Sequence, residues 1–247
     1  MRSIRSAVLT SFLLAGSFLL AATAQADIKV VLKITTDIPA LRAKLANNPQ
    51  AQQMMSALGL SGNGITMVIY GSGPRSRVDF GNIISSISDK KTSTVIMVNR
   101  MLHSYSSTST PPGTASPRVT YRATGRTKTI LGHLCREYTG KDITANGGVS
   151  SVDAWTAADL PTISYDSGLG SGASALPAGL KGIPLSLTAK SSGPMGPMTV
   201  HLQATSISRG AISASVFSVP SGYTLTAGGG MFPGMGAGMP SAGGSGQ

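Results

Sequence analysis

The sequence predicts a mainly β protein built on an antiparallel meander, with one or two short helices after the first strand. Short runs rich in β-branched residues recur about every ten residues from Ile65 onward, and Gly, Pro, Asn and Ser separate them, as in consecutive antiparallel strands. Asn146-Gly147 is a strong hairpin signal, because both positions tolerate the positive φ angles of a tight primed turn. Between the first two strands, apolar residues repeat at helical spacing. These three observations define the fold class.

The first 26 residues are predicted to be a signal peptide rather than part of the fold. Arg2 and Arg5 form a positive n-region, and residues 7–22 are uncharged and largely apolar. Ala24-Gln25-Ala26 then supplies the small-x-small pattern that a signal peptidase reads. The alternative, an uncleaved anchor, is disfavoured because the apolar run is barely long enough to span a bilayer. We expect cleavage after Ala26, export to the periplasm and no membrane span in the mature protein.

The mature chain is expected to begin with a strand and then a helical segment. Ile28 to Thr35 is rich in β-branched residues and is predicted to be the first strand. Asp37 can cap the helix that follows, because its carboxylate can accept the free backbone N–H groups of the first turn. Two apolar stripes separated by Pro49 then follow: Ile38, Leu41 and Leu45, and after them Ala51, Met54, Met55 and Leu58. The sequence therefore favours two short helices or one kinked helix.

From Ile65 to Val219 the chain reads as short strands and turns. The predicted strands cover residues 65–70, 75–80, 83–88, 92–98, 101–106, 118–123, 127–130, 134–143, 149–156, 182–190, 198–208 and 215–219. Ser106 to Pro117 and Asp159 to Leu176 are expected to be loops. Residues 27–227 are predicted to form one domain. The Gly/Met/Pro-rich tail, residues 228–247, cannot bury enough apolar surface to offset its ordering entropy, so disorder is expected there.

The chain is basic, with a formal net charge of +11 that falls to +9 when Arg2 and Arg5 leave with the signal peptide. The charges are scattered, and the densest group is Arg118, Arg122, Arg126 and Lys128. Nucleic-acid binding is typically signalled by a concentrated basic face with aromatics or by a recognisable module. The sequence shows neither, so we expect no nucleic-acid partner. Solubility and weak attraction to anionic surfaces account for the charge.

Cys135 is the single cysteine of the chain. It cannot form an internal disulfide, so an ordinary hydrophobic core must stabilise the domain. Pairing with another chain or a reactive thiol are the functional alternatives. A small buried hydrophobic role is favoured, because free cysteine is among the most buried residue types.

Five segments resemble, in order, an uncharacterised exported bacterial family, domain-of-unknown-function family 4412. They are Arg77-Val78-Asp79, the TILGHLCREY run of residues 129–138, the WTAADLP run of 155–161, the GIPL run of 182–185 and the FSVPSGY run of 217–223. The residues that carry the resemblance are interpreted as structural: Arg77, Asp79, Gly132, Cys135, Pro184, Pro220 and Gly222. Gly132 is expected to allow the turn between two strands.

The resemblance implies a shape rather than an activity. The family is similar in predicted shape to the periplasmic lipoprotein carriers and their outer-membrane receptor. It therefore implies a half-barrel: a curved antiparallel sheet with one or two short helices packed in its concavity. The Met/Gly tail and the long Ser/Thr/Pro loop depart from the carriers. Because one fold hosts many functions, this analogy predicts fold and compartment more firmly than activity.

No pattern in the sequence indicates a metal or cofactor site in the folded domain. The histidines are far apart and none has a metal-ligand spacing such as H-x-x-x-H; they are His103, His133 and His201. We expect no cofactor. A weaker hypothesis is Cu(I) handling by the tail methionines, because thioethers are soft ligands. A disordered linker with incidental methionines is favoured; the three are Met231, Met235 and Met239.

The sequence predicts no enzyme. Asp153 and Asp159 flank Trp155 and would fit paired carboxylates for acid–base work, but surface loop and strand-edge positions explain them better. No G-x-S-x-G elbow is present, and no phosphate-cradling glycine loop precedes a helix.

The leading functional hypothesis is a non-catalytic periplasmic protein that binds a lipid or another apolar ligand in a half-barrel groove. Four aromatic residues either fill the core or line such a groove: Tyr138, Trp155, Phe217 and Tyr223. The alternative hypothesis is a structural or adaptor protein of the cell envelope, which docks a protein partner through a sheet edge or the tail.

Overall fold

The computed structural model describes residues 27–40, 43, 47–50, 52–53, 64–109, 120–143, 149–160, 180, 182–193 and 196–226. Within them the fold is mainly β, as predicted. The strands are β1 (Ile28–Asp37), β2 (Ile65–Ser72), β3 (Arg75–Phe80), β4 (Ile84–Asp89), β5 (Thr94–Asn99), β6 (Ser104–Ser109), β7 (Thr120–Ile130), β8 (His133–Ile143), β9 (Val149–Ala157), β10 (Ile183–Gly193), β11 (Gly196–Arg209) and β12 (Thr224–Leu225). A short 3-10 helix, η1, spans Ala214–Phe217.

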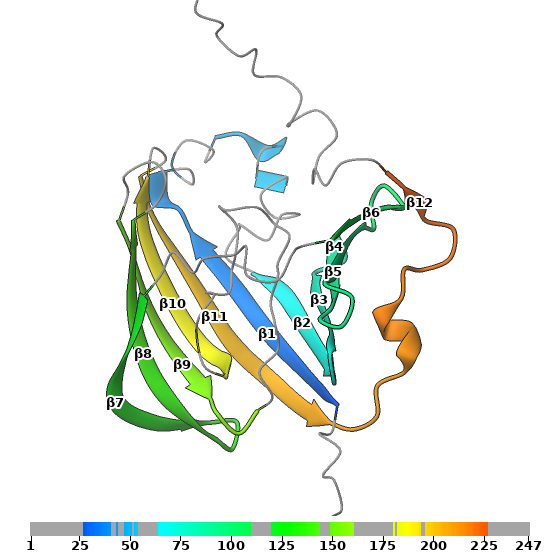
Figure 1. The fold of residues 1–247 in the computed structure, drawn as a ribbon. Helices are drawn as coiled ribbons and strands as arrows, with labels where there is room; N and C mark the ends of the chain where they lie inside the picture. The colour runs from blue at the N-terminus through cyan, green and yellow to red at the C-terminus, as the bar shows by residue number, and fades with distance from the viewer. Residues whose placement is uncertain are drawn as a thin grey trace, which may run out of the picture.

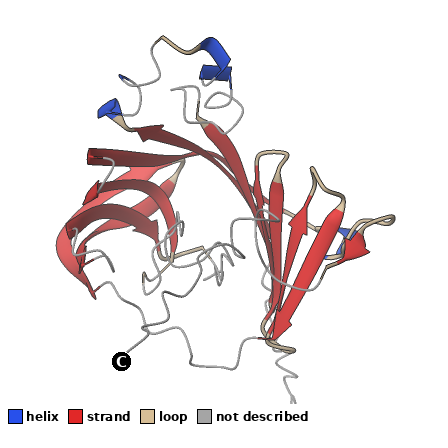
Figure 2. Ribbon diagram, turned by 90° about the horizontal axis from the view of Figure 1, so that it is seen from above, coloured by secondary structure: helices blue, strands red, loops and turns tan. Residues whose placement is uncertain are grey.

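All twelve strands belong to one open sheet with the order β12-β6-β5-β4-β3-β2-β1-β11-β10-β9-β8-β7. Strand β1 lies inside the sheet, between the β2–β6 meander on one side and the β7–β11 meander on the other (Figure 1). The two meanders form wings that stand at an angle to each other (Figure 2). The sheet is bent rather than closed or strongly curled, since β7 and β12 form its two edges.

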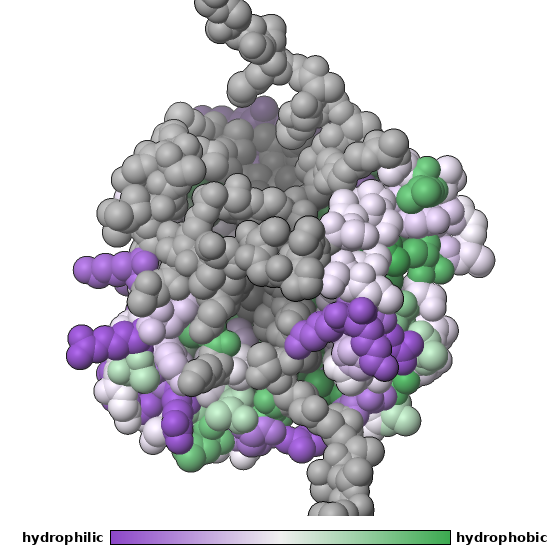
Figure 3. Space-filling view, viewed as in Figure 1, coloured by the Kyte–Doolittle hydropathy of each residue, from purple (hydrophilic) through white to green (hydrophobic). Residues whose placement is uncertain are grey.

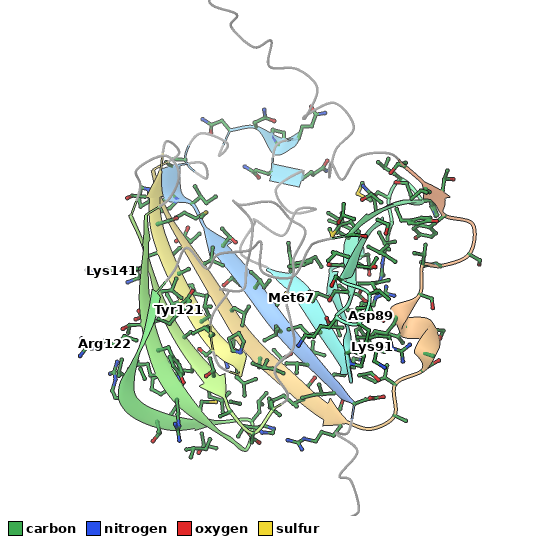
Figure 4. All side chains as sticks on the ribbon, viewed as in Figure 1. Met67, Asp89, Lys91, Tyr121, Arg122 and Lys141 are labelled. Atoms are coloured by element: carbon green, nitrogen blue, oxygen red, sulfur yellow. The ribbon has the colours of Figure 1, made fainter. Side chains whose placement is uncertain are left out.

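Strand alternation gives the sheet an inner face, toward the space between the wings, and an outer face. Met67 and Tyr121 point inward, whereas Arg122 and Lys141 point outward (Figure 4). Directly paired residues share a face, so the register extends these assignments to every strand. Strict alternation keeps the apolar residues of β1 on the inner face, and the register shift opposite Val31 and Leu32 is a bulge in β11, where Thr205 has no paired residue in β1.

The main core lies on the inner face. Its buried members on this face are Ile28, Val30, Leu32 and Ile34 in β1, Met67 and Ile69 in β2, Val78 in β3, Val152 and Ala154 in β9, Leu187 in β10, and Leu202 and Ala204 in β11. The same core continues to one end of the β7–β11 wing, where its other buried members lie: Cys135, Ala157, Leu160, Ile183 and Leu185. Strand β1 supplies four of them because every second residue of its IKVVLKIT run is aliphatic. Paired with β2 and β11 on its two sides, β1 joins the wings into one apolar layer.

A second, smaller core lies on the outer face of the β2–β6 wing. Phe217 of η1 packs there with Ile87 and Val98. The chain then runs on to β12, which pairs in parallel with β6 at the sheet edge. The backbone N–H of Ile212 donates to Asp27 at 2.8 Å, so the chain that leaves β11 is tied to the start of β1. The C-terminal segment thus covers part of the outer face and one edge.

The structure corrects three of the predicted elements. Residues 215–219 are not a strand, because Ser213 accepts the Ser215 N–H and starts a 3-10 turn. The strand expected at 101–106 begins at Ser104, because the Asn99 side chain accepts the N–H groups of Met101 and Leu102 and holds them in a turn. The two strands expected at 118–123 and 127–130 are one strand, β7, with a register shift.

The described residues of the predicted helices do not lie in the concavity. Helical backbone is described at Pro39, Ala40, Ala43, Pro49, Gln50, Gln52 and Gln53, and no bounded α-helix is assigned among the described residues. These side chains are exposed except for the half-buried Ala40, since most of them are polar or small. They lie beyond the end of β1 rather than across the sheet (Figure 1).

Several sequence-based predictions fall outside the described residues. These are the signal peptide (1–26), most of the helical apolar stripes, residues 110–117 of the predicted loop, the Asn146-Gly147 turn, most of the loop from Asp159 to Leu176, and the tail (228–247). The first four residues of the loop expected at 106–117 are described and are not a loop, because they continue β6 and pair with β5. Within the part of the chain that is described, no helix is long and apolar enough to cross a membrane.

Candidate functional site

Arg77 and Asp79 form a buried cluster that anchors the C-terminal segment. The Arg77 Nε lies 2.6 Å from Asp79 Oδ1, and Nη1 donates to the backbone oxygen of Val216 at 2.7 Å. Arg100 makes a second ion pair with Asp79 at 3.1 Å. Ser85 accepts hydrogen bonds from both arginines. The first segment of the resemblance therefore binds the residue that directly precedes the last segment, in a structural arrangement.

Phe217 and Tyr223, two of the four candidate aromatics, belong to this C-terminal segment. Phe217 is buried on the outer face, with the guanidinium of Arg75 4.9 Å from its ring centroid. Tyr223 lies against His103, with ring centroids 5.3 Å apart. Gly222 precedes it with a φ of 81°, which favours glycine, and Pro220 is exposed. Neither aromatic lies on the inner face.

The other three segments of the resemblance meet at one end of the β7–β11 wing. Ala157 pairs with Cys135 on one side and with Ile183 on the other. Gly182 has a φ of 88°, and a Cβ there would lie 2.4 Å from the Ala157 carbonyl oxygen. Pro184 is fully buried next to a register shift in β10. The backbones come so close here that only glycine fits at position 182.

Cys135 is packed into this strand-end cluster as an uncharged thiol. Its side chain is fully buried and donates to the His133 carbonyl oxygen at 3.5 Å. Burial raises the pKa of the Cys135 thiol, and the negative charge of Asp159 adds to the effect. A nucleophilic cysteine needs a lowered pKa and access. The geometry therefore favours the packing role over the reactive one.

The His133 ring forms a contact that the sequence did not reveal. Its Nδ1 lies 2.7 Å from Asp159 Oδ2, and Arg209 approaches the same oxygen at 3.6 Å. The Asp159 carboxylate is half exposed. Because Cys135 contacts the backbone of His133 rather than its ring, the three residues do not form a nucleophile–base–orienter series.

Glu137, the sole glutamate, is buried and holds the bulge of β7. Thr124 and Arg126 both donate to its carboxylate across the strand pair. Burial alone would raise the pKa of Glu137, but the hydrogen bonds from Thr124 and Arg126, with the positive charge of Arg126, outweigh it and hold the pKa below its usual value. Gly125 permits the turn in the bulge with a φ of 83°. No sequence pattern marks this interaction of Glu137 with Thr124 and Arg126, because it depends on the strand register.

The inner face is the first surface with the properties of a binding site. Its layer of aliphatic side chains spans both wings. Tyr138 lies on this face, paired with Ala154, and is half-buried. Thr156 is fully buried on the same face, and its hydroxyl has no hydrogen-bond partner among the described residues. One buried hydroxyl thus lies beside a continuous apolar layer.

The outer face of β7–β11 and β1 is the second such surface, and it is basic. Hydrophilic side chains project from the β7–β8 side of the molecule (Figure 3). Six exposed cations on this surface define what we call the basic outer face: Lys29, Lys33, Arg122, Lys128, Lys141 and Lys190. Trp155 is half-buried among them, and Lys128 lies 4.2 Å above its ring centroid. The four candidate aromatics are therefore on different surfaces.

Among the described residues, no group of three or more His, Cys, Asp or Glu side chains is arranged to hold a metal ion. The described part of the chain therefore adds no metal centre to the two surfaces.

Comparisons with known proteins add a limited result. No family model matches the chain, and no curated protein matches it. Among solved structures, the chain is similar to PNGF-II, described as "Structure of PNGF-II in C2 space group", with a TM-score of 0.43 and 12% identity. The match covers 81% of this chain and 30% of that chain. The resemblance to family 4412 therefore stays a prediction.

Proposed function

We propose that this protein is a non-catalytic periplasmic protein that binds a lipid or another apolar ligand against the inner face of its sheet, used as a half-barrel groove. The aliphatic layer across both wings supports the proposal. Each methylene of an acyl chain buried there would contribute about 0.8 kcal/mol. The predicted signal peptide and the resemblance to the lipoprotein carriers favour the same compartment and ligand class.

The observation that carries the proposal is the buried hydroxyl of Thr156. It has no partner among the described residues, and leaving such a group unsatisfied costs about 1–3 kcal/mol. The hydroxyl and the adjacent aliphatic side chains are buried, so a ligand with an apolar chain and one polar group would have to replace what covers them. Its polar group would then satisfy the hydroxyl. Tyr138, on the same face, would contact the apolar part.

Native mass spectrometry of the mature protein, purified from its envelope, tests the proposal. We expect a co-purifying lipid and binding of a fluorescent fatty-acid probe. Thr156→Val, which keeps the shape and removes the hydroxyl, should weaken probe binding about tenfold, the loss of roughly one such hydrogen bond. Thr139→Val, on the outer face of β8, is the matched control and should bind normally. Absence of both co-purifying lipid and probe binding would overturn the proposal.

A second candidate is an adaptor role through a sheet edge. Strand β7 is an edge strand of eleven residues, and β12 covers only the first two residues of β6. Such edges can pair with a strand from another protein. Deletion of the tail after Ala227 distinguishes docking through a sheet edge from docking through the tail. The deletion would abolish docking through the tail and leave docking through the edge intact. The Cu(I) hypothesis is wrong if a Cu(I) titration of the protein is unaffected by replacement of Met231, Met235 and Met239.

A further inference from the structure

We propose that the basic outer face binds the surface of an anionic lipid bilayer. This surface is distinct from the inner face, so the inference does not depend on the proposed apolar ligand. It assigns a partner to the excess of positive charge on the chain. The arrangement of these charges on one face follows from the strand register and not from the sequence alone.

The cations of the basic outer face come from four strands, β1, β7, β8 and β10, which the register aligns. Lys141 and Lys190 both pair with Ser151 of β9, so they lie on one line across the sheet, two strands apart. Arg122 pairs with Thr139, which lies two residues before Lys141 in β8. It therefore belongs to the next line of outer-face residues across the sheet. Adjacent strands are about 4.8 Å apart, so Lys141 and Lys190 lie about 10 Å from each other. The positive charges are spread in two dimensions.

The acidic groups on this surface do not cancel the cations. Glu137 is already paired with Arg126. The aligned lines contain two other carboxylates, Asp153 and Asp37. Asp153 pairs in register with Thr139 and Thr188, and Asp37 lies at the end of β1. Against these two stand the six exposed cations of the basic outer face. The net charge is therefore positive over the whole area.

Trp155 gives this surface a group suited to a bilayer interface. It lies between Ser186 and Glu137 in the register, with the Lys128 ammonium above its ring. Tryptophan is enriched at membrane–water interfaces because its ring is apolar and its N–H is polar. A cation over the ring places a headgroup-binding charge next to it.

A planar anionic surface fits this arrangement better than a nucleic-acid strand. A single strand is bound by a charged groove with successive stacking aromatics, whereas here the cations spread over a sheet face around one tryptophan. Attraction to an anionic leaflet increases with each lysine or arginine near it, by about fivefold in affinity per cation. The described residues thus favour the bilayer.

Vesicle co-sedimentation of the mature protein tests this assignment. We expect binding to vesicles of phosphatidylcholine mixed with phosphatidylglycerol, weakening as salt is raised, and no binding to phosphatidylcholine alone. Lys141→Gln with Lys190→Gln should weaken binding on the order of tenfold or more. The matched control is Lys90→Gln with Lys91→Gln, in the β4–β5 turn on the other wing, which removes the same charge (Figure 4).

Trp155 supplies a second readout, since it is the sole tryptophan. Its fluorescence should shift to the blue on vesicle binding, and Thr156→Val should leave this shift unchanged because it alters the inner face only. Absence of vesicle binding would overturn the inference. So would an equal loss in the Lys90/Lys91 control, which would mean net charge alone acts, or tighter binding to short duplex DNA than to vesicles.

Discussion

At the scale of single residues, Glu137 shows how one carboxylate fixes a strand irregularity. The register of β7 and β8 shifts between Ala123 and Thr127, so residues 124–126 have no regular pairing partners in β8. Their polar groups need other hydrogen-bond partners. Glu137 accepts from Thr124 and Arg126 and so closes the bulge. The carboxylate is buried, whereas Arg126 is 69% exposed. Solvent therefore screens the ion pair and limits its contribution to stability.

Glu137→Gln should lower the free energy of unfolding by about 1–2 kcal/mol at neutral pH, less than the loss for a fully buried pair. The lowered pKa of Glu137 gives the sign of the pH dependence. Its contribution is present above the pKa of the unfolded chain, about 4.3, and is lost as pH falls through the lower folded value. Denaturant unfolding of both proteins across this range measures the effect. A difference that persists unchanged at strongly acidic pH would contradict it.

Cys135 should react slowly with a thiol reagent while the protein is folded. Burial raises the pKa of its thiol, and the reactive species is the thiolate. At pH 8 we expect labelling by a disulfide reagent to be at least about a hundredfold slower than in denaturant, a ratio set by local opening. Rapid labelling of the folded protein would revive the reactive-thiol hypothesis. Cys135→Ser should then lose function without losing thermal stability.

At the scale of elements, most strands were predictable because local composition and turn residues determine them. Gly132 was correctly expected at a turn: with Leu131 it forms a two-residue loop in which both φ angles are positive. The segment 215–219 was misread as a strand because its apolar residues pack onto another strand pair, and periodicity cannot show that. Strand β12 has two residues and pairs with a distant strand, so no local pattern marks it.

The approach of β10 to β9 at Gly182 gives a prediction with an internal control. Gly182→Ala and Gly125→Ala share almost the same φ, 88° and 83°, so both pay a similar conformational cost of about 1 kcal/mol. A Cβ at residue 182 would also collide with the Ala157 carbonyl, whereas nothing lies near a Cβ at residue 125. Thermal unfolding should show Gly182→Ala less stable than Gly125→Ala by about 2 kcal/mol or more. Equal losses would mean that the backbones separate freely.

At the scale of the whole molecule, the sequence could not place the candidate surfaces. It grouped Arg118, Arg122, Arg126 and Lys128 because they are close in the chain. In the sheet, Arg126 forms an ion pair with Glu137. Lysines from β1, β8 and β10 lie on the same face as Arg122. Which face each residue occupies depends on strand register and on the bulge in β11. Long-range pairing of this kind leaves no trace in composition or spacing.

The same long-range organisation makes Arg77 the residue on which the C-terminal segment depends. It joins β3 to the backbone of η1, more than a hundred residues later in the chain. In Arg77→Leu, the Val216 carbonyl loses its donor, and Asp79 keeps only Arg100. Removing one member of a buried ionic cluster costs about 3–5 kcal/mol, more than the segment's few apolar contacts can offset.

We therefore expect Arg77→Leu to release residues 212–226 while the β7–β11 wing stays folded. Hydrogen exchange should accelerate in η1 and β12, and apolar dye binding should rise as Ile87 and Val98 lose the cover of Phe217. Arg75→Leu is the matched control, because the contact described between Arg75 and that segment is with the ring of Phe217, and its loss should cost about 1 kcal/mol. Release to the same extent in both variants would show that general packing, and not the Arg77 cluster, holds the segment. Loss of protection in β8 and β9 as well would show that the two wings unfold as one unit.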